Sequence, residues 1–568
     1  MKLALKNGIV YDPLNNIRGE KKDILIKDGK VVEKLWGRRK TIDVSNKVVM
    51  PGGIDIHSHI AGGKVNVGRS FRPEDHEKFV VAKNGITRSG SGFSTPSTFI
   101  TGYLYSKMGY TTVFTPAMPP LMARHTHEEL HDLPMIDKAS YALCDGNWFI
   151  MRYLKNGEIE KCAAYVAWLL RATKGLVIKL TNPGGTEAWG WGKDCRSLNE
   201  PVPHFGITPA EIIEGLIKVN ELLGLPHSVH LHTNNLGRLG NWSTTVETFK
   251  IANGLKSNNG RQSLHVAHAQ FHAYGGSTWK DFESKADEVV KGLMSNDSVT
   301  IDTGNVTLDE TTTMTADGPM EYYLQSLTHL KWANRGVEME TSPGVTPFVY
   351  SKKKATSSIQ WGIGLELALL LKDPWKVLLS TDHPNGGPFI RYPRIKAWLM
   401  SSKYREKSIK EVHKAIGKRG IIPTIDREYD LYEIAVITSA AAAKAFGFEK
   451  DKGHLGPGAI ADVAVYDIDA EKINGNDYEE LEKKFANTAY TLKDGEVVVK
   501  DGEIVKVVNG RTYWANAKVG ESLEKEVMKD IDYNFKRYYS VNLANYPVHE
   551  LYLTRPTEIK IDASSRVT

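Results

Sequence analysis

VMPGGIDIHSH, residues 49–59, is a short apolar segment that ends in two histidines, His57 and His59. The apolar run before the histidines predicts a buried β-strand. Residues i and i+2 of a strand point to the same face, so both imidazoles meet at the end of this strand. Imidazole is the commonest metal ligand in proteins, and it suits zinc. Because His-x-His pairs also occur by chance in ordinary strands, the metal-site interpretation depends on other segments.

The composition predicts a cytoplasmic, globular protein with at least two structural units. The 568 residues include 25% charged ones, and the formal net charge is only +6. No basic stripe with interleaved aromatic residues is present, so we expect no nucleic-acid partner. No apolar run reaches the roughly 18 residues of a membrane helix, so we expect no membrane span. Cys144, Cys162 and Cys195 lack CxxC spacing, which favours a reducing environment and argues against an iron–sulfur cluster or cysteine-bound zinc in this chain.

Both ends of the chain contain short β segments with similar turns. Residues 23–26 and 30–32 flank an Asp-Gly turn, which is a strong hairpin signal. The same pattern returns in residues 461–466 and 490–502. These patterns predict one small β-sandwich domain that is formed from both termini, with the rest of the chain inserted between them.

The middle of the chain alternates apolar strand-like runs with helix-like stretches such as 209–223 and 359–371. This alternation indicates the α/β class with parallel strands, and its length suits a TIM-type (β/α)8 barrel with long loops. Residues 431–447 are an Ala-rich helix with a glycine stop, whereas the last fifty residues show no clear periodicity. The expected domains are residues 1–50 as the first part of the β domain, 51–425 as the barrel, 426–515 as the helix and second part of the β domain, and 516–568 as a C-terminal tail.

Lys179 ends a second apolar run, residues 175–180. A buried ammonium costs several kcal/mol unless it is paired or neutral. Desolvation lowers the pKa of such a lysine, and a neutral amine can add carbon dioxide to form a carbamate, an oxygen ligand that is able to bridge two metals. Taken alone, the segment fits better a lysine whose ammonium group reaches solvent.

Histidines lie at the ends of two further strand-like segments, residues 228–235 and 263–270. Barrel active sites form at the C-terminal ends of the strands. We therefore favour His232 over His230, and His268 over His265, as metal ligands, although either member of each pair has the right side chain. His230, His265 and His272 are more readily explained as packed histidines or as partners of the ligands.

Asp382 follows the apolar run 377–381 and precedes His-Pro. A carboxylate at this point can ligate a metal and also accept or return a proton during catalysis. In chain order the candidates are His57, His59, Lys179, His232, His268 and Asp382, each closing a strand-like run. Their nitrogen and oxygen donors suffice for two zinc ions bridged by a carbamate.

The ordered set resembles the amidohydrolase superfamily of the dihydroorotase, hydantoinase and D-aminoacylase type. The segments PGGIDIHSH (51–59), STDHP (380–384), ITSAAAAKAFGF (437–448) and HLGPGAIADVAVYD (454–467) carry the resemblance. It implies two Zn²⁺ ions bridged by N6-carboxylysine at Lys179, with Asp382 as the catalytic residue. One zinc would be held by His57, His59, Lys179 and Asp382, and the other by Lys179, His232 and His268. Where hydantoinases have His-Ala-Glu-Asn, this chain has His-Thr-Asn-Asn at 232–235, which removes a carboxylate near the site.

Further segments resemble the family of formylmethanofuran dehydrogenase A subunits. They are HIAGGKVNVGR (59–69), NPGGTEAWGWG (182–192), LHVAHAQFHAYGG (264–276) and YLTRPTEIKI (552–561). This resemblance implies a multi-subunit complex of methanogenic archaea, in which the partners are iron–sulfur subunits together with a molybdenum or tungsten pterin subunit. The chain of this family would condense formate with the amine of methanofuran.

Three alternatives stay open on the sequence. A stand-alone zinc amidohydrolase acting on a cyclic or N-acyl amide would use the same ligands. A related subunit of a formyltransferase/hydrolase complex in methylotrophic bacteria would release formate. A non-catalytic barrel used as a scaffold is disfavoured by the complete ligand set. The Trp-rich loop 188–192 fits a long substrate or a partner surface, and equally a packed aromatic cluster.

Overall fold

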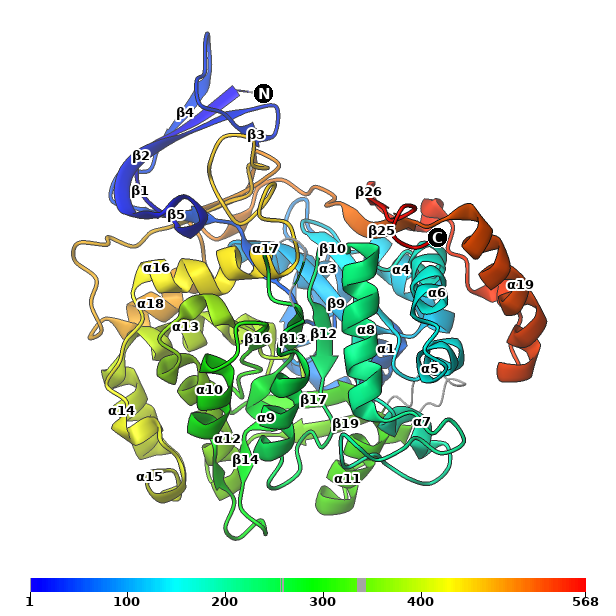
Figure 1. Cartoon of the computed structure of the whole chain (residues 1–568). Coiled ribbons are helices and arrows are strands. Elements are labelled where there is room, and N and C mark those ends of the chain that lie inside the picture. Colours follow the sequence, from blue (N-terminus) through cyan, green and yellow to red (C-terminus); the bar gives the residue numbers. More distant parts are fainter. Residues whose placement is uncertain (1, 256, 258–259, 335–343) are drawn as a thin grey trace.

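Parallel β-strands form a closed barrel at the centre of the chain (Figure 1). The computed structural model describes residues 2–255, 257, 260–334 and 344–568. Each barrel strand pairs in parallel with the next, and a parallel bridge between Ser58 and His383 closes the ring. The prediction of a TIM-type barrel is therefore confirmed. In order around the barrel, the strands are β6 (Gly53–Asp55), β9 (Tyr110–Met118), β10 (Asp137–Leu143), β11 (Val177–Thr181), β12 (Val229–His232), β13 (Leu264–Val266), β16 (Val299–Asp302) and β20 (Val377–Leu378).

Helices surround the barrel and follow its strands in the chain (Figure 1). The predicted helix 209–223 is α8 (Pro209–Leu223), which begins at a capping box between Thr208 and Glu211 and ends at Gly224 with a positive φ. The predicted helix 359–371 is α12 (Ala355–Leu370). Other helices around the barrel are α3 (Thr98–Lys107), α4 (Ala123–His131), α5 (Trp148–Lys155), α6 (Ile159–Thr173), α9 (Trp242–Ile251), α10 (Ala286–Met294) and α13 (Tyr392–Met400).

A second sheet combines strands from the two ends of the chain, as the sequence predicts. Asp28 and Gly29 both have positive φ and join β2 to β3, which confirms the predicted hairpin. In the middle of this sheet β5 pairs with β1 on one side and with β21 on the other. The domain boundaries themselves stay a prediction. The strands are β1 (Lys2–Asp12), β2 (Ile17–Lys27), β3 (Lys30–Val31), β4 (Lys40–Asp43), β5 (Val48–Pro51), β21 (Val463–Tyr466), β22 (Tyr490–Lys493), β23 (Glu496–Lys500) and β24 (Glu503–Ile504).

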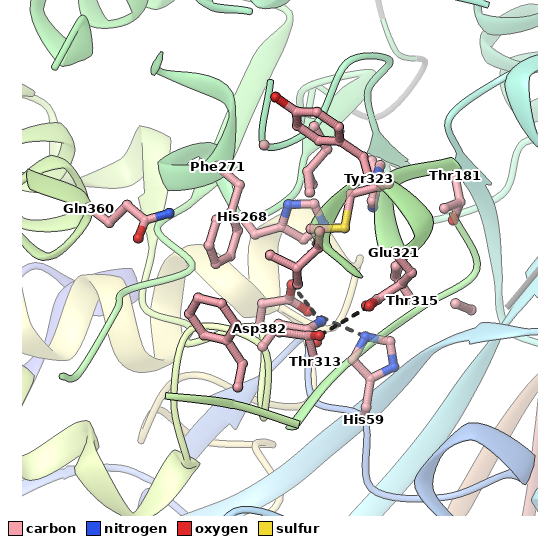
Figure 2. A pocket seen from close by; sticks show the side chains of 18 of the residues that line it. His59, Thr181, His268, Phe271, Thr313, Thr315, Glu321, Tyr323, Gln360 and Asp382 are labelled. Atoms are coloured by element: carbon pink, nitrogen blue, oxygen red, sulfur yellow. Dashed lines mark hydrogen bonds and ion pairs between the residues drawn. The ribbon is translucent and has the colours of Figure 1, made fainter. Parts of the chain in front are cut away.

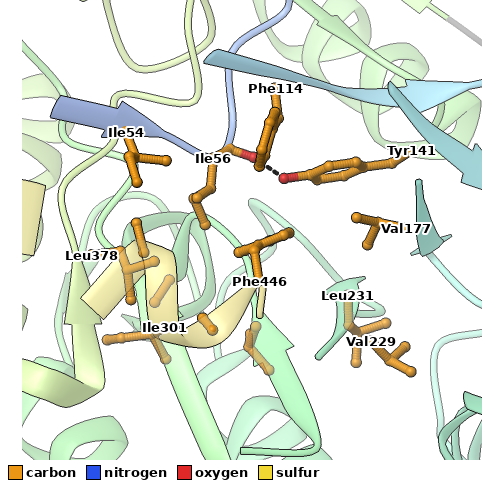
Figure 3. Close-up of a cluster of buried hydrophobic side chains, with 14 of the residues drawn as sticks. Ile54, Ile56, Phe114, Tyr141, Val177, Val229, Leu231, Ile301, Leu378 and Phe446 are labelled. Atoms are coloured by element: carbon orange, nitrogen blue, oxygen red, sulfur yellow. Dashed lines mark hydrogen bonds between the residues drawn. The ribbon is translucent and has the colours of Figure 1, made fainter. Parts of the chain in front are cut away.

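The predicted Ala-rich helix fills the N-terminal end of the barrel. It runs as α16 (Leu431–Ala435), a π-helical turn (Val436–Ala440) and α17 (Ala441–Ala445). Its end delivers Phe446 into the barrel core, where the ring stacks on Tyr141 at 5.6 Å between centroids (Figure 3). This end of the barrel is packed, so access to the interior comes from the opposite, C-terminal end.

The C-terminal region differs from the expected tail without periodicity. Strand β25 (Thr512–Lys518) extends the barrel sheet by pairing with β10, and β26 (Pro556–Asp562) pairs with β25. Between them, α19 (Glu521–Tyr538) buries an apolar stripe that recurs every four residues: Leu523, Val527, Ile531 and Phe535. The many charged residues between these positions conceal the helical period in the sequence. In the described residues, no helix is long and apolar enough to cross a membrane.

An insertion between β16 and β20 covers the C-terminal end of the barrel. This cover consists of β17 (Glu310–Thr315), α11 (Gly318–Thr328), β18 (Ala333–Asn334) and β19 (Gly344–Val349). Helix α1 (Gly63–Phe71) packs against it through Val65, which contacts Met314 and Val345 in a buried cluster. Figure 1 shows β17, β19 and α11 on the side of the barrel away from the N-terminal sheet.

A buried ion network joins the base of the barrel to the N-terminal sheet. Asp137 Oδ2 lies 2.6 Å from Lys452 Nζ and 3.1 Å from Lys493 Nζ, and Lys452 also contacts Asp462 at 2.6 Å. Burial alone would raise the pKa of Asp137, but the charges of Lys452 and Lys493 outweigh it and hold this pKa well below its usual value. The carboxylate is therefore ionised and fixes two buried ammonium groups.

Replacement of Asp137 by Asn is expected to destabilise the chain by about 3–5 kcal/mol, because it leaves two buried cations short of an anion. A lowered midpoint of urea denaturation measures the effect. Because the pKa of Asp137 is lower in the folded chain than the value of about 3.9 in the unfolded chain, its ionised form stabilises the fold fully above that unfolded pKa. This stabilisation is lost as the pH falls from the unfolded pKa through the folded one. The difference between variant and wild type should therefore shrink in acid. The exposed pair of Asp469 with Lys472 is the control, and Asp469→Asn should leave the midpoint unchanged.

Candidate metal centre and active site

A pocket at the C-terminal end of the barrel brings together all six predicted ligands. Its wall includes His57, His59, Lys179, His232, His268 and Asp382, each at the end of a different barrel strand except for the His-x-His pair. His230, His265 and His272 are buried but are not part of this wall. Residues two apart on a barrel strand point into the same interior at different depths, so the geometry places His232 nearer the pocket than His230. Which histidines bind metal stays a prediction.

Asp382 is the centre of the inner pocket (Figure 2). Its Oδ1 lies 2.8 Å from His57 Nε2 and 3.3 Å from His59 Nε2, and its Oδ2 lies 3.9 Å from His268 Nε2. Asp382 and His268 both have positive φ, 50° and 37°. Non-glycine residues hold this conformation only where the surroundings impose it, which is common at functional sites. The backbone is thus arranged to point these two side chains at the same position.

A layer of polar side chains behind the pocket orients the candidate ligands. His57 Nδ1 is 2.8 Å from His230 Nε2, and His265 Nε2 is 3.1 Å from Asp302 Oδ2. Asp302 Oδ1 also accepts a hydrogen bond from the His268 backbone N–H at 2.9 Å. Such partners set the tautomer and direction of metal-binding histidines. The sequence analysis missed Asp302, although it ends strand β16 in the same way as Asp382 follows β20.

Lys179 is buried, and its Nζ has no hydrogen-bonding partner among the described residues. Burial lowers its pKa to about 8, against the opposing charges of Asp382, Asp302 and Asp145. A buried amine without a partner is costly unless something else occupies its surroundings. A carbamate held by metal ions would remove this cost, so Lys179 fits the predicted role.

A carboxylate from the cover lies beside His232, although the residues that directly follow His232 include none. Residues 232–235 are His-Thr-Asn-Asn, where hydantoinases have His-Ala-Glu-Asn. In the structure Asp317, at the start of α11, lies 3.1 Å from His232 Nε2. This contact occupies Nε2 of His232 and leaves Nδ1 as its other ring nitrogen. Asn234 turns away from the pocket and donates to Asn182 Oδ1 at 2.8 Å.

Aromatic and aliphatic side chains line the outer pocket. Gln360 Nε2 donates a hydrogen bond to the Tyr274 hydroxyl at 2.6 Å, which fixes one side of the opening. Apolar side chains therefore make up most of this part of the wall. The other lining residues of this part are Leu236, Phe271, Trp279, Met320, Tyr323, Leu324, Leu327, Phe348 and Tyr350.

Two segments that the sequence analysis singled out lie beside the pocket. In the flank 59–69, Arg69 forms an ion pair with Glu129, whose other oxygen accepts from the Gly62 N–H at 2.7 Å. That flank therefore anchors α1 on α4. In the Trp-rich loop, Trp189 packs on Tyr322 of the cover at 5.4 Å between ring centroids, so this part of the loop is a packed aromatic cluster.

Comparison with known proteins shows which sequences this chain resembles. The profile of the amidohydrolase family matches residues 40–499. The chain is 58% identical over 569 residues to Protein FwdA of Methanocaldococcus jannaschii, covering 99% of this chain and all of that protein. It is 35% identical over 533 residues to a chain of the Fhc formyltransferase/hydrolase complex of Methylorubrum extorquens, covering 92% and 93% of the two chains.

A solved structure extends the second similarity to the whole fold. It is the crystal structure of the formyltransferase/hydrolase complex (FhcABCD) from Methylorubrum extorquens in complex with methylofuran. A chain of that complex superposes with a TM-score of 0.88 at 33% identity, covering 99% of this chain and 100% of the other. The cover, the C-terminal strands and the barrel are thus shared with a protein of known structure.

Proposed function

Because the chain belongs to the amidohydrolase family, we propose that it is the amidohydrolase subunit of a formylmethanofuran dehydrogenase. It condenses formate with the amine of methanofuran to N-formylmethanofuran, and it catalyses the reverse reaction. The convergence of six ligand-type side chains on one aromatic-lined pocket carries this proposal. The 58% identity to Protein FwdA favours this subunit over the formyl-releasing subunit of methylotrophs, to which the identity is 35%.

The donor set of the inner pocket fits two zinc ions. His57, His59 and Asp382 place three ligand atoms within 4.8 Å of one another, and Lys179 supplies an amine without a hydrogen-bonding partner among the described residues. The bridging ligand would be the carbamate of Lys179, with His232 and His268 on the second ion. When bound, the ions supply positive charge that makes the formyl carbon more electrophilic and stabilises negative charge on its oxygen.

Asp382 moves the proton in the proposed reaction. In hydrolysis its carboxylate takes a proton from the attacking water and then passes it to the departing amine nitrogen. In synthesis the same carboxyl group returns the proton to the oxygen that leaves as water. Burial raises the pKa of Asp382, against the lowering effect of His59, and a raised pKa makes the carboxylate a better proton acceptor. Asn385 Nδ2 donates to its Oδ2 at 2.9 Å and holds the side chain in place.

A multi-subunit complex supplies the conditions that synthesis needs. Dilute water favours hydrolysis of an amide, so condensation requires a high local concentration of formate. The relative of known structure belongs to a complex, FhcABCD. For this chain we propose a molybdenum or tungsten pterin subunit that produces formate, together with iron–sulfur subunits. The cytoplasmic location expected from the cysteine pattern stays a prediction.

Purification from the native source tests the proposal. The chain should co-purify with metal–pterin and iron–sulfur subunits, and the complex should release formate from N-formylmethanofuran at a rate at least 100-fold above its rate on dihydrouracil or an N-acyl amino acid. Formate release is measured enzymatically, the amine freed from an N-acyl amino acid by a fluorescent amine reagent, and ring opening of dihydrouracil by its loss of ultraviolet absorbance. A chain that purifies alone and prefers the cyclic amide would establish the stand-alone amidohydrolase instead.

A further inference from the structure

Glu321 is a buried carboxyl group that the reaction described above leaves without a role. It lies on α11 of the cover, is 0% exposed and forms part of the wall of the active-site pocket. Its Oε2 accepts a hydrogen bond from the Thr313 hydroxyl at 3.1 Å, whereas its Oε1 is buried without a hydrogen bond in the described part of the chain. Figure 2 shows Glu321 beside Thr313, on the same side of the pocket as His59.

The packing around Glu321 holds this side chain in one position. A Cβ atom added at Gly344 of β19 would lie 2.4 Å from Glu321 Cβ, so the strand passes directly over the side chain. The charged and titratable groups that face the carboxyl are Asp317 on the same helix, Lys64 on α1, Asp382 on the barrel and Tyr350 after β19. Burial raises the pKa of Glu321 to about 8, against the hydroxyls of Thr346 and Thr313.

We propose that Glu321 receives the amine end of the substrate: its carboxylate binds the incoming ammonium and takes one proton from it. This inference rests on the proposed function. One N–H bond breaks, one O–H bond forms on Glu321, and the electron pair stays on nitrogen, which then attacks the carbon of formate. Asp382 carries a second proton from the nitrogen to the departing oxygen, and the proton held on Glu321 follows it, so that this oxygen leaves as water. In hydrolysis, Glu321 returns that proton to the freed amine, which leaves as an ammonium.

The chemistry of the pocket requires such a group. A primary alkylamine, like a lysine side chain, has a pKa of about 10, so it arrives protonated and without a free electron pair. The predicted zinc ions repel an ammonium, and so does the charged form of Lys64, which faces Glu321 and Asp382. Oε1 of Glu321 is an unfilled acceptor in the wall among the described residues, and a hydrogen bond to a charged group there is worth a roughly 10- to 100-fold change in affinity. A neutral N-formyl amide does not need this contact.

The test compares how the intact complex with Glu321→Gln binds the charged product and the uncharged substrate. At pH 9, above the pKa of Glu321 and below that of the amine, the inhibition constant of free methanofuran in the deformylation assay should rise roughly 10- to 100-fold. The KM for N-formylmethanofuran should stay within about twofold, because the amide carries no charge. The rise in the inhibition constant should shrink toward pH 7, where Glu321 is protonated, and above pH 10, where the amine becomes neutral. Glu321→Asp should recover part of the affinity for methanofuran.

Two outcomes would overturn the inference. An unchanged inhibition constant would show that Glu321 does not bind the amine, and a parallel rise of KM and inhibition constant at all pH values would show a purely structural role. Glu187→Gln is the matched control, because Glu187 is buried, has a raised pKa and accepts from Trp191 Nε1 at 3.1 Å, but lies outside this pocket. Its kinetics should match the wild type. If the wild-type complex does not deformylate N-formylmethanofuran, the proposed function fails before Glu321 is tested.

Discussion

Lys179→Ala should leave less than one zinc per chain and lower the rate of N-formylmethanofuran hydrolysis by a factor of roughly 10³ or more. Lys179 lies at the end of β11 with its amine buried and unpartnered among the described residues. Its pKa of about 8 makes part of the amine neutral at physiological pH, and only the neutral amine can add carbon dioxide. Metal analysis of the purified complex and the deformylation rate measure the two effects.

A second buried lysine provides the control for Lys179. Lys396 on α13 lies over the rings of Tyr110, Tyr466 and Phe485, at 4.9–5.5 Å from their centroids. Burial lowers its pKa to about 7, yet it lies outside the pocket. Lys396→Met should therefore keep both the zinc and the activity. Full zinc content in Lys179→Ala would contradict the role of Lys179 as the bridging ligand.

Asp382→Asn should abolish most turnover while the chain keeps at least one metal ion. General acid–base catalysis contributes roughly 10² to 10⁴ in rate, and the loss should appear in kcat more than in KM. The amide keeps the shape of the side chain and one oxygen toward His57 and His59. The measurement is single-turnover release of formate from N-formylmethanofuran, with metal content determined on the same sample.

Asp12→Asn separates loss of a catalytic carboxylate from general damage. Asp12 is equally buried, but it lies in the N-terminal sheet, where Oδ2 accepts from Asn15 Nδ2 at 2.7 Å and from the Leu455 N–H at 2.8 Å. This variant should keep wild-type turnover. Wild-type turnover in Asp382→Asn as well would eliminate Asp382 as the proton carrier.

The sequence predicts much of the barrel and the inner pocket because both follow local rules. Strands of the barrel end in the polar residues that line its mouth, so His57, Lys179 and Asp382 could be found one segment at a time. The preference for His232 over His230 rests on one rule: of two residues on the same face of a barrel strand, the later one lies nearer the C-terminal opening. The structure places His232 in the pocket wall and His230 behind it.

The parts that the sequence does not reveal depend on contacts between distant segments. Glu321 reaches the pocket, and Asp317 reaches His232, only because the cover folds back over the barrel, and no spacing within 310–328 indicates that return. Asp302 ends a strand like the other candidates, but it contacts His265 rather than the pocket. Helix α19 is hard to recognise in the sequence because charged residues separate its apolar positions. Its apolar stripe becomes clear only in the structure, where it is buried.

The position of the cover has a consequence for how such proteins diversify. The predicted metal ligands all come from barrel strands, whereas Asp317, Glu321 and the aromatic residues 323, 348 and 350 come from one continuous insertion between β16 and β20. Substrate choice can therefore drift by changes confined to this insertion while the catalytic machinery is inherited intact. Exchanging the segment between related chains is accordingly a direct route to redesigned amide specificity.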